Sequence, residues 1–133
     1  MNLKNKVTNK ELSKKIWDLG WRLRTEFYWV DVFENLEGNE ECWQIHHIGW
    51  FNDQKESYHP IPAPLACEIM KILPSDFSVH NTNQGFEVCE YKQELLPYKE
   101  LLYTCKCFTV ADTEANAIAK TLIYLTERGR IKP

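Results

Sequence analysis

Two cysteines near the C-terminus have a spacing that could bind a metal. Cys105 and Cys107 form a C-x-C pair, and two thiolates can supply half of a tetrahedral zinc site. The side chains that could complete such a site are three histidines, His46, His47 and His59. We nevertheless expect no metal, because residues two apart on a strand share a face, and alternation with Tyr103 is typical of small side chains in a core.

The same histidines could in principle act in catalysis. An imidazole titrates near neutrality and can serve as a general base. However, His46 and His47 are adjacent, so on a strand they point to opposite faces. No serine or cysteine nucleophile with an orienting carboxylate accompanies them. The sequence therefore predicts no catalytic residue and no cofactor, and it favours a binding protein over an enzyme.

Aromatic side chains are the most prominent group that could bind a partner. The chain of 133 residues contains five Trp, six Tyr and six Phe, and each such side chain buries about 150–250 Å² when it is packed. This surplus exceeds what one core needs, and aromatic residues on a surface are effective contact anchors. The residues that we expect at a binding surface are Trp29, Trp43, His47, Trp50, Tyr58 and His59.

Length and composition indicate one globular domain that spans residues 1–133. Hydrophobic residues make up 44% and charged residues 26% of the chain, as is usual for such domains. No apolar run reaches the ~18 residues of a membrane span. The five cysteines are an odd number without a disulfide framework. We therefore expect a cytoplasmic protein whose thiols are reduced and buried as small apolar groups.

The charge is distributed unevenly along the chain. Residues 25–100 carry four Lys/Arg against fourteen Asp/Glu, whereas residues 1–24 carry seven Lys/Arg against two Asp/Glu. The acidic centre would repel phosphates. Nucleic-acid binding through the basic ends is therefore the least favoured of the binding hypotheses.

Hydrophobic periodicity predicts an α+β fold. Helices are expected over 8–20, with Thr8 and Glu11 as a capping box, over 64–73, and over 112–129, with Asp112 as N-cap. The expected strands cover 26–33, 42–48, 77–80, 86–91 and 101–109, with a loop over 49–64 and a linker through Pro97. The predicted order is α-β-β-α-β-β-β-α, a mostly antiparallel sheet of about five strands with three amphipathic helices.

The chain also resembles a family of small phage and prophage proteins. The resemblance is carried by the element order, by a helix that opens at Ile61-Pro62-Ala63-Pro64-Leu65-Ala66, and by Ala111-Asp112-Thr113-Glu114-Ala115 before the last helix. It covers roughly residues 26–128 and is similar to the group described as phage α/β sandwich proteins. It implies an accessory protein of a phage or mobile element, and it implies no functional residue.

These observations leave two main hypotheses for function. The first is a non-enzymatic module that binds another protein, with a homo-oligomer left open. The alternative is a small enzyme or ligand-binding protein with a pocket around residues 46–64. The alternative requires a histidine of that segment to meet a carboxylate and an aromatic wall in a concave site.

Overall fold

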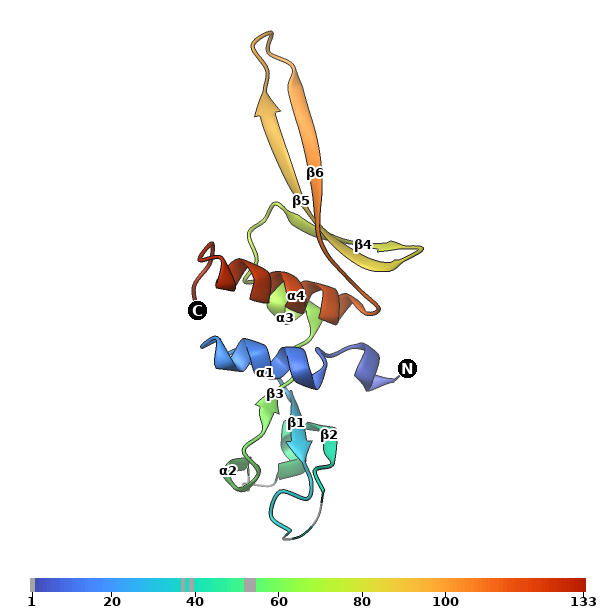
Figure 1. The fold of residues 1–133 in the computed structure, drawn as a ribbon, viewed down its shortest axis with the longest axis vertical. Helices are drawn as coiled ribbons and strands as arrows, with labels where there is room; N and C mark the ends of the chain where they lie inside the picture. The colour runs from blue at the N-terminus through green and yellow to red at the C-terminus, as the bar shows by residue number, and fades with distance from the viewer. Residues whose placement is uncertain (1, 37, 39, 52–54) are drawn as a thin grey trace.

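The computed structural model describes residues 2–36, 38, 40–51 and 55–133. Its helices form a layer between two three-stranded antiparallel sheets (Figure 1), ordered β2-β1-β3 and β4-β5-β6. The first sheet contains β1 (Phe27–Asp31), β2 (Trp43–His47) and β3 (Ile61–Pro62). The second contains β4 (Phe77–Thr82), β5 (Gly85–Leu95) and β6 (Leu101–Ala111). The predicted α+β class and the antiparallel pairing are confirmed.

The helices are α1 (Lys10–Asp18), the single-turn α2 (Lys55–Tyr58), α3 (Ala66–Met70) and α4 (Glu114–Glu127). Two short 3₁₀ turns, η1 (Leu3–Asn5) and η2 (Ile48–Phe51), complete the list. Among the described residues, no helix has both the length and the apolar character needed to cross a membrane.

The prediction of one sheet of about five strands is wrong. The segment expected to be a loop contains β3, which pairs with β1 through Tyr28↔Pro62 and Trp29↔Ile61. Because β3 occupies the edge of β1 opposite β2, no edge of β1 is free for the later strands. Strands β4, β5 and β6 instead form a separate sheet on the other side of the helices (Figure 1).

Helix α4 lies at the centre of the core. Its predicted apolar stripe is fully covered, and Ile118, Leu122 and Leu125 are each 0% exposed. The helix ends before Gly129, whose φ of +71° suits a residue without a side chain. Its N-cap is Thr113, not Asp112 as expected, because the Thr113 hydroxyl accepts a hydrogen bond from the amide of Asn116 at 3.2 Å.

Helix α1 runs parallel to α4 and is joined to it near both ends. At the start, the Asn9 amide donates to Asn116 Oδ1 at 2.8 Å, and past the end Trp21 Nε1 donates to Thr126 Oγ1 at 3.0 Å. Asn9 is also the N-cap of α1. The expected cap Thr8 is buried, and its hydroxyl donates to the Pro64 carbonyl at 3.0 Å. The Leu12 amide donates instead to Asn9 Oδ1 at 2.8 Å.

Beyond Glu90, which pairs with Phe77 at the start of β4, strands β5 and β6 continue as a two-stranded arm that projects from the body (Figure 1). Their pairing extends to Leu95↔Leu101, and the Leu96 amide donates to the Glu100 carbonyl at 2.8 Å across the tip. The expected linker through Pro97 is therefore a hairpin turn. Lys99 closes it with a φ of 65°.

Candidate functional site

The arm has two chemically different faces. The cross-strand register places one uncharged set of residues on a single face, which we call the uncharged face: Cys89, Tyr91, Gln93, Leu95, Leu101, Tyr103, Cys105 and Cys107. The opposite face, which we call the charged face, holds Glu90, Lys92, Glu94, Leu102, Thr104 and Lys106. The arm is thus amphipathic, as a strand pair is when only one of its faces is covered.

Among the residues that the structure describes, none covers most of the uncharged face. Leu95 is 69%, Tyr103 66% and Leu101 49% exposed, and Tyr98 at the tip is 67% exposed. Single exposed apolar residues are common, but these side chains lie together on one projecting element.

A β-bulge decides which face the cysteines occupy. The register changes from Val88↔Thr109 to Cys89↔Cys107, so Phe108 is an extra residue on β6. Phe108 packs edge-on against Tyr124, and the Thr109 hydroxyl donates to the Ala117 carbonyl at 2.8 Å. Two consecutive residues therefore face the helices.

Because of this bulge, the side chains of β6 that were expected to face the core point to the outer face in the part of the strand before Phe108. Cys105 and Cys107 lie on the outer face and are exposed. Their interpretation as core residues is therefore wrong. Of the five cysteines, Cys89 alone is buried, while Cys42 is half-buried and Cys67 is exposed.

The thiols of the uncharged face meet at the base of the arm. Cys89 lies against both Cys105 and Cys107, and burial, followed by these two neighbouring thiols, raises the pKa of Cys89 to about 12. The Tyr91 hydroxyl reaches back to His80 Nε2 at 2.7 Å. On β4, Ser78 lies opposite Cys89 and His80 lies opposite Glu87. To reach His80, the Tyr91 side chain therefore passes over Cys89 and helps to bury it.

Two of the residues predicted to bind a partner have structural contacts. Trp29 is only 8% exposed, and its Nε1 donates to the Thr8 carbonyl at 2.8 Å. Trp43 is half-buried, with Lys10 Nζ 4.8 Å from its ring centroid. Trp29 belongs to the core between β1 and the N-terminal segment and offers no free surface.

The structure brings Trp50 and Tyr58 together. Their ring centroids are 5.3 Å apart, and the ring of His46 stacks on Trp50 at 4.1 Å. Burial lowers the pKa of His46, and Trp50 remains 40% exposed. These rings form a small aromatic cluster beside Phe51.

His47 and His59 point elsewhere and do not share a site. His47 Nε2 lies 3.6 Å from a Glu26 carboxylate oxygen, while His59 Nδ1 lies 2.8 Å from Glu34 Oε1. His59 thus meets a carboxylate, as the alternative hypothesis requires, and a pocket around residues 46–64 stays a hypothesis. Part of that segment, residues 52–54, lies outside the described residues.

The histidines and the C-x-C pair cannot form the metal site considered from the sequence. His46 and His47 lie on β2, and His59 lies between α2 and β3. Strands β2 and β3 belong to the sheet at the opposite end of the molecule from β6 (Figure 1). The side chains next to Cys107 are instead Cys89 and Glu87 on the neighbouring strand.

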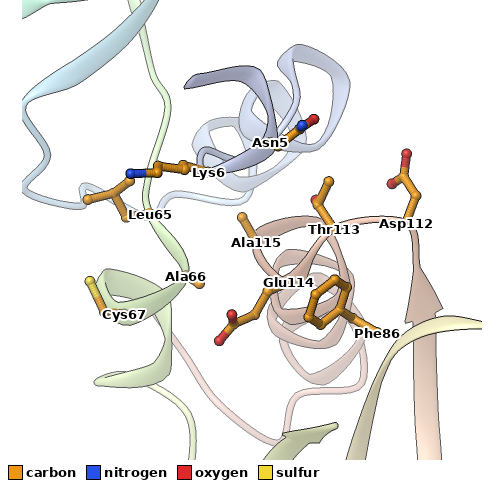
Figure 2. Close-up of a pocket in the computed structure, with 10 residues that line it drawn as sticks. All are labelled: Asn5, Lys6, Leu65, Ala66, Cys67, Phe86, Asp112, Thr113, Glu114 and Ala115. Carbon is orange, nitrogen blue, oxygen red and sulfur yellow. The ribbon is translucent and has the colours of Figure 1, made fainter. Parts of the chain in front are cut away.

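A groove of about 640 Å³ opens beside the start of α4. Figure 2 shows that Lys6 comes from the segment before α1, Cys67 from α3 and Glu114 from the start of α4. The carboxylates of Asp112 and Glu114 take the position at a helix N-terminus that would otherwise attract an anion. The mixed charges make this groove a poor receptor for the uncharged arm.

Comparison with protein-family models, curated proteins and solved structures gave no match. The resemblance to phage α/β sandwich proteins therefore stays a prediction.

The residues of the arm that sequence reasoning did not single out are Tyr91, Leu95, Leu101 and Tyr103. A signal was present, since uncharged residues recur at every second position on both sides of the turn at Pro97. The segment through Pro97 was interpreted as a linker and not as a hairpin turn. The residues before it and after it were therefore not treated as paired strands.

Proposed function

We propose that this chain is a non-enzymatic protein-interaction module whose docking element is the uncharged face of the β5–β6 arm. The supporting observation is the division of charge across the arm: Lys92, Glu94 and Lys106 all lie on the charged face. An apolar strand face outside the domain body is stabilised only when another surface covers it.

The occupant that we propose for this face is a second copy of the chain. A face without charges meets its own copy without electrostatic repulsion, and a two-fold axis lets the same patch serve both partners. Tyrosine is enriched at protein interfaces, and Tyr91, Tyr98 and Tyr103 are all exposed here.

The exposed area is consistent with a weak dimer. Tyr91, Leu95, Tyr98, Leu101 and Tyr103 are 41–69% exposed. With ~150–250 Å² for a fully covered aromatic side chain, they offer roughly 500 Å² per copy. Two copies then bury about 1,000 Å², the lower limit for a specific interface. We expect a dissociation constant in the micromolar range.

The charges of the arm disfavour a nucleic-acid partner. Its basic residues are Lys92, Lys99 and Lys106, and its acidic residues are Glu90, Glu94 and Glu100. They cancel, so the arm lacks the excess of positive charge that phosphate binding requires.

Sedimentation velocity of reduced protein, from about 5 to 500 µM, tests the proposal over the affinity range expected for an interface of this size. The expected result is a monomer–dimer equilibrium. Tyr103→Asp, at the centre of the uncharged face, should weaken the dimer by at least tenfold. Thr104→Asp is the matched control, because it adds the same charge one residue away on the charged face. It should leave the equilibrium unchanged.

Two results would contradict this proposal. A protein that stays monomeric over the whole concentration range has no second copy on the arm. If Tyr103→Asp and Thr104→Asp weakened the dimer equally, the dimer would lie elsewhere or depend on charge alone. Circular dichroism of both variants shows whether the arm and the body remain folded.

A further inference from the structure

The base of the arm gathers three groups that can bind a metal. The Sγ atoms of Cys89 and Cys107 and a carboxylate oxygen of Glu87 lie within 4.8 Å of one another. Cys89 and Cys107 are direct cross-strand partners, and Glu87 precedes Cys89 by two residues on β5. In a tetrahedral site with Zn–S of about 2.3 Å and Zn–O of about 2.0–2.2 Å, ligand atoms are roughly 3.5–4 Å apart. Small side-chain rotations would bring the three groups to that spacing.

We propose that Glu87, Cys89 and Cys107 form a binding site for a divalent cation of the zinc type, with Cys105 as the thiol that completes a tetrahedron. Thiolate ligands select zinc-like ions over Mg²⁺ and Ca²⁺, which prefer oxygen. Cys105 is in reach because it lies against Cys89. The site differs from the one first considered, since no histidine takes part.

The position of the site explains how an ion could enter and what it would do. Cys107 is exposed, so the ion can reach it from solvent, while Cys89 is buried and would close the inner side. An ion held by Cys89 on β5 and Cys107 on β6 would join the two strands where the arm leaves the body. Binding would therefore stiffen the arm.

The bulge at Phe108 is what makes this site geometrically feasible. Without the extra residue, Cys107 would alternate to the helix side and could not meet Cys89 and Glu87 on the outer face. Metal binding displaces a proton from each ligating thiol to solvent. The affinity should therefore decrease as the pH falls.

Titration of reduced, metal-free protein with Zn²⁺ against a chromophoric chelator, and separately with Cd²⁺, tests the site. We expect one ion per chain, with the ultraviolet charge-transfer absorption of a cadmium–thiolate bond. Cys107→Ser and Glu87→Gln should each weaken binding by at least about tenfold, since loss of an outer-shell partner alone costs about 10–100-fold. Cys67→Ser is the matched control, because Cys67 is also exposed but lies on α3.

The outcomes separate this inference from the proposed docking function. No binding to reduced wild-type protein, or equal binding by wild type and Cys107→Ser, would overturn the site. Thermal melting gives a second readout: Zn²⁺ should raise the Tm of the wild type and of Cys67→Ser, but not that of Cys107→Ser. A chain that binds Zn²⁺ but stays monomeric would keep this inference and reject the dimer.

Discussion

Arg130 Nη2 donates to Glu90 Oε2 at 2.6 Å, and this contact ties the segment after α4 to the middle of β5. The Glu90 side chain is only 2% exposed, whereas that of Arg130 is 43% exposed. Burial is the largest influence on the Glu90 carboxyl and by itself would raise its pKa. The hydrogen bond and charge of Arg130, together with Asp76 and Lys92, outweigh burial, and the pKa is lowered below its ordinary value.

Glu90 should therefore contribute to acid denaturation. A carboxyl whose pKa is lower in the folded state stabilises the protein above its unfolded pKa, near 4.5, and that stability is lost as the pH falls through the folded value. In Arg130→Ala, burial should dominate and raise the Glu90 pKa. The variant should lose about 1–3 kcal/mol at pH 7, because the buried carboxylate is left without its main hydrogen-bond donor.

Chemical denaturation between pH 7 and pH 3 measures this difference. The gap between the wild type and Arg130→Ala should start to narrow above pH 4.5, as the pH falls through the raised Glu90 pKa of the variant, because protonation there removes the unpaired charge. It should continue to narrow until the pH passes the lowered pKa of Glu90 in the wild type. Arg128→Ala is the control, because Arg128 stacks on Tyr124 at 4.6 Å and should cost less than about 1 kcal/mol. A gap that is independent of pH would show that the ion pair is not the cause.

Helix α4 gives a second prediction. Leu122 is 0% exposed, so Leu122→Ala should lower the free energy of unfolding by about 2–5 kcal/mol through lost transfer energy and a cavity. Lys120 is exposed, and its Nζ donates to the Val110 carbonyl at 3.1 Å. Lys120→Ala should change stability by less than about 0.5 kcal/mol. Equal denaturation midpoints would mean that the stripe does not face the core.

The helices and hairpins were predictable because their signals are local. The stripe of α4 repeats at helical spacing, and the paired strands β1 and β2 follow each other directly in the order of strands along the chain. The helix caps were each misplaced by one residue. Thr8 and Asn9, like Asp112 and Thr113, are adjacent capping residues, and in each pair the side chain of the second residue accepts the capping hydrogen bond.

The division into two sheets and the faces of β6 depend on contacts distant in sequence. Strand β3 is two residues long and contains Pro62. It is therefore too short for hydrophobic periodicity to predict it. The bulge exists because Phe108 packs between Phe77 and Tyr124, and no pattern within β6 shows that pairing. The exposed cysteines and the arm surface could not be assigned without it.

The third prediction concerns Trp29 and Trp50, which were both expected at a binding surface but differ in burial. Trp29→Phe should cost about 1–3 kcal/mol, because it leaves a cavity and removes the hydrogen bond from Nε1 to the Thr8 carbonyl. Trp50→Phe changes a side chain that is 40% exposed, and it should cost less than about 1 kcal/mol. Urea denaturation of both variants compares them, and a larger loss for Trp50→Phe would contradict this assignment.

The cysteines provide the last prediction, which tests the faces of the arm directly. In the folded, metal-free protein, the exposed Cys67, Cys105 and Cys107 should react quickly with an alkylating reagent. Cys89 should react at least about tenfold more slowly, because it is buried and its pKa is raised from 9.0 to about 12, which leaves far less of the reactive thiolate.

Timed alkylation at pH 8 followed by peptide mass spectrometry measures each rate. Unfolding in denaturant without reductant should make all five cysteines react alike, because it removes both burial and the neighbouring thiols. If Cys105 and Cys107 were instead as slow as Cys89 in the folded protein, they would face the core, as simple alternation along β6 suggests. The bulge at Phe108, the uncharged face and the metal site at its base would then all be wrong, since each requires these two thiols on the outer surface.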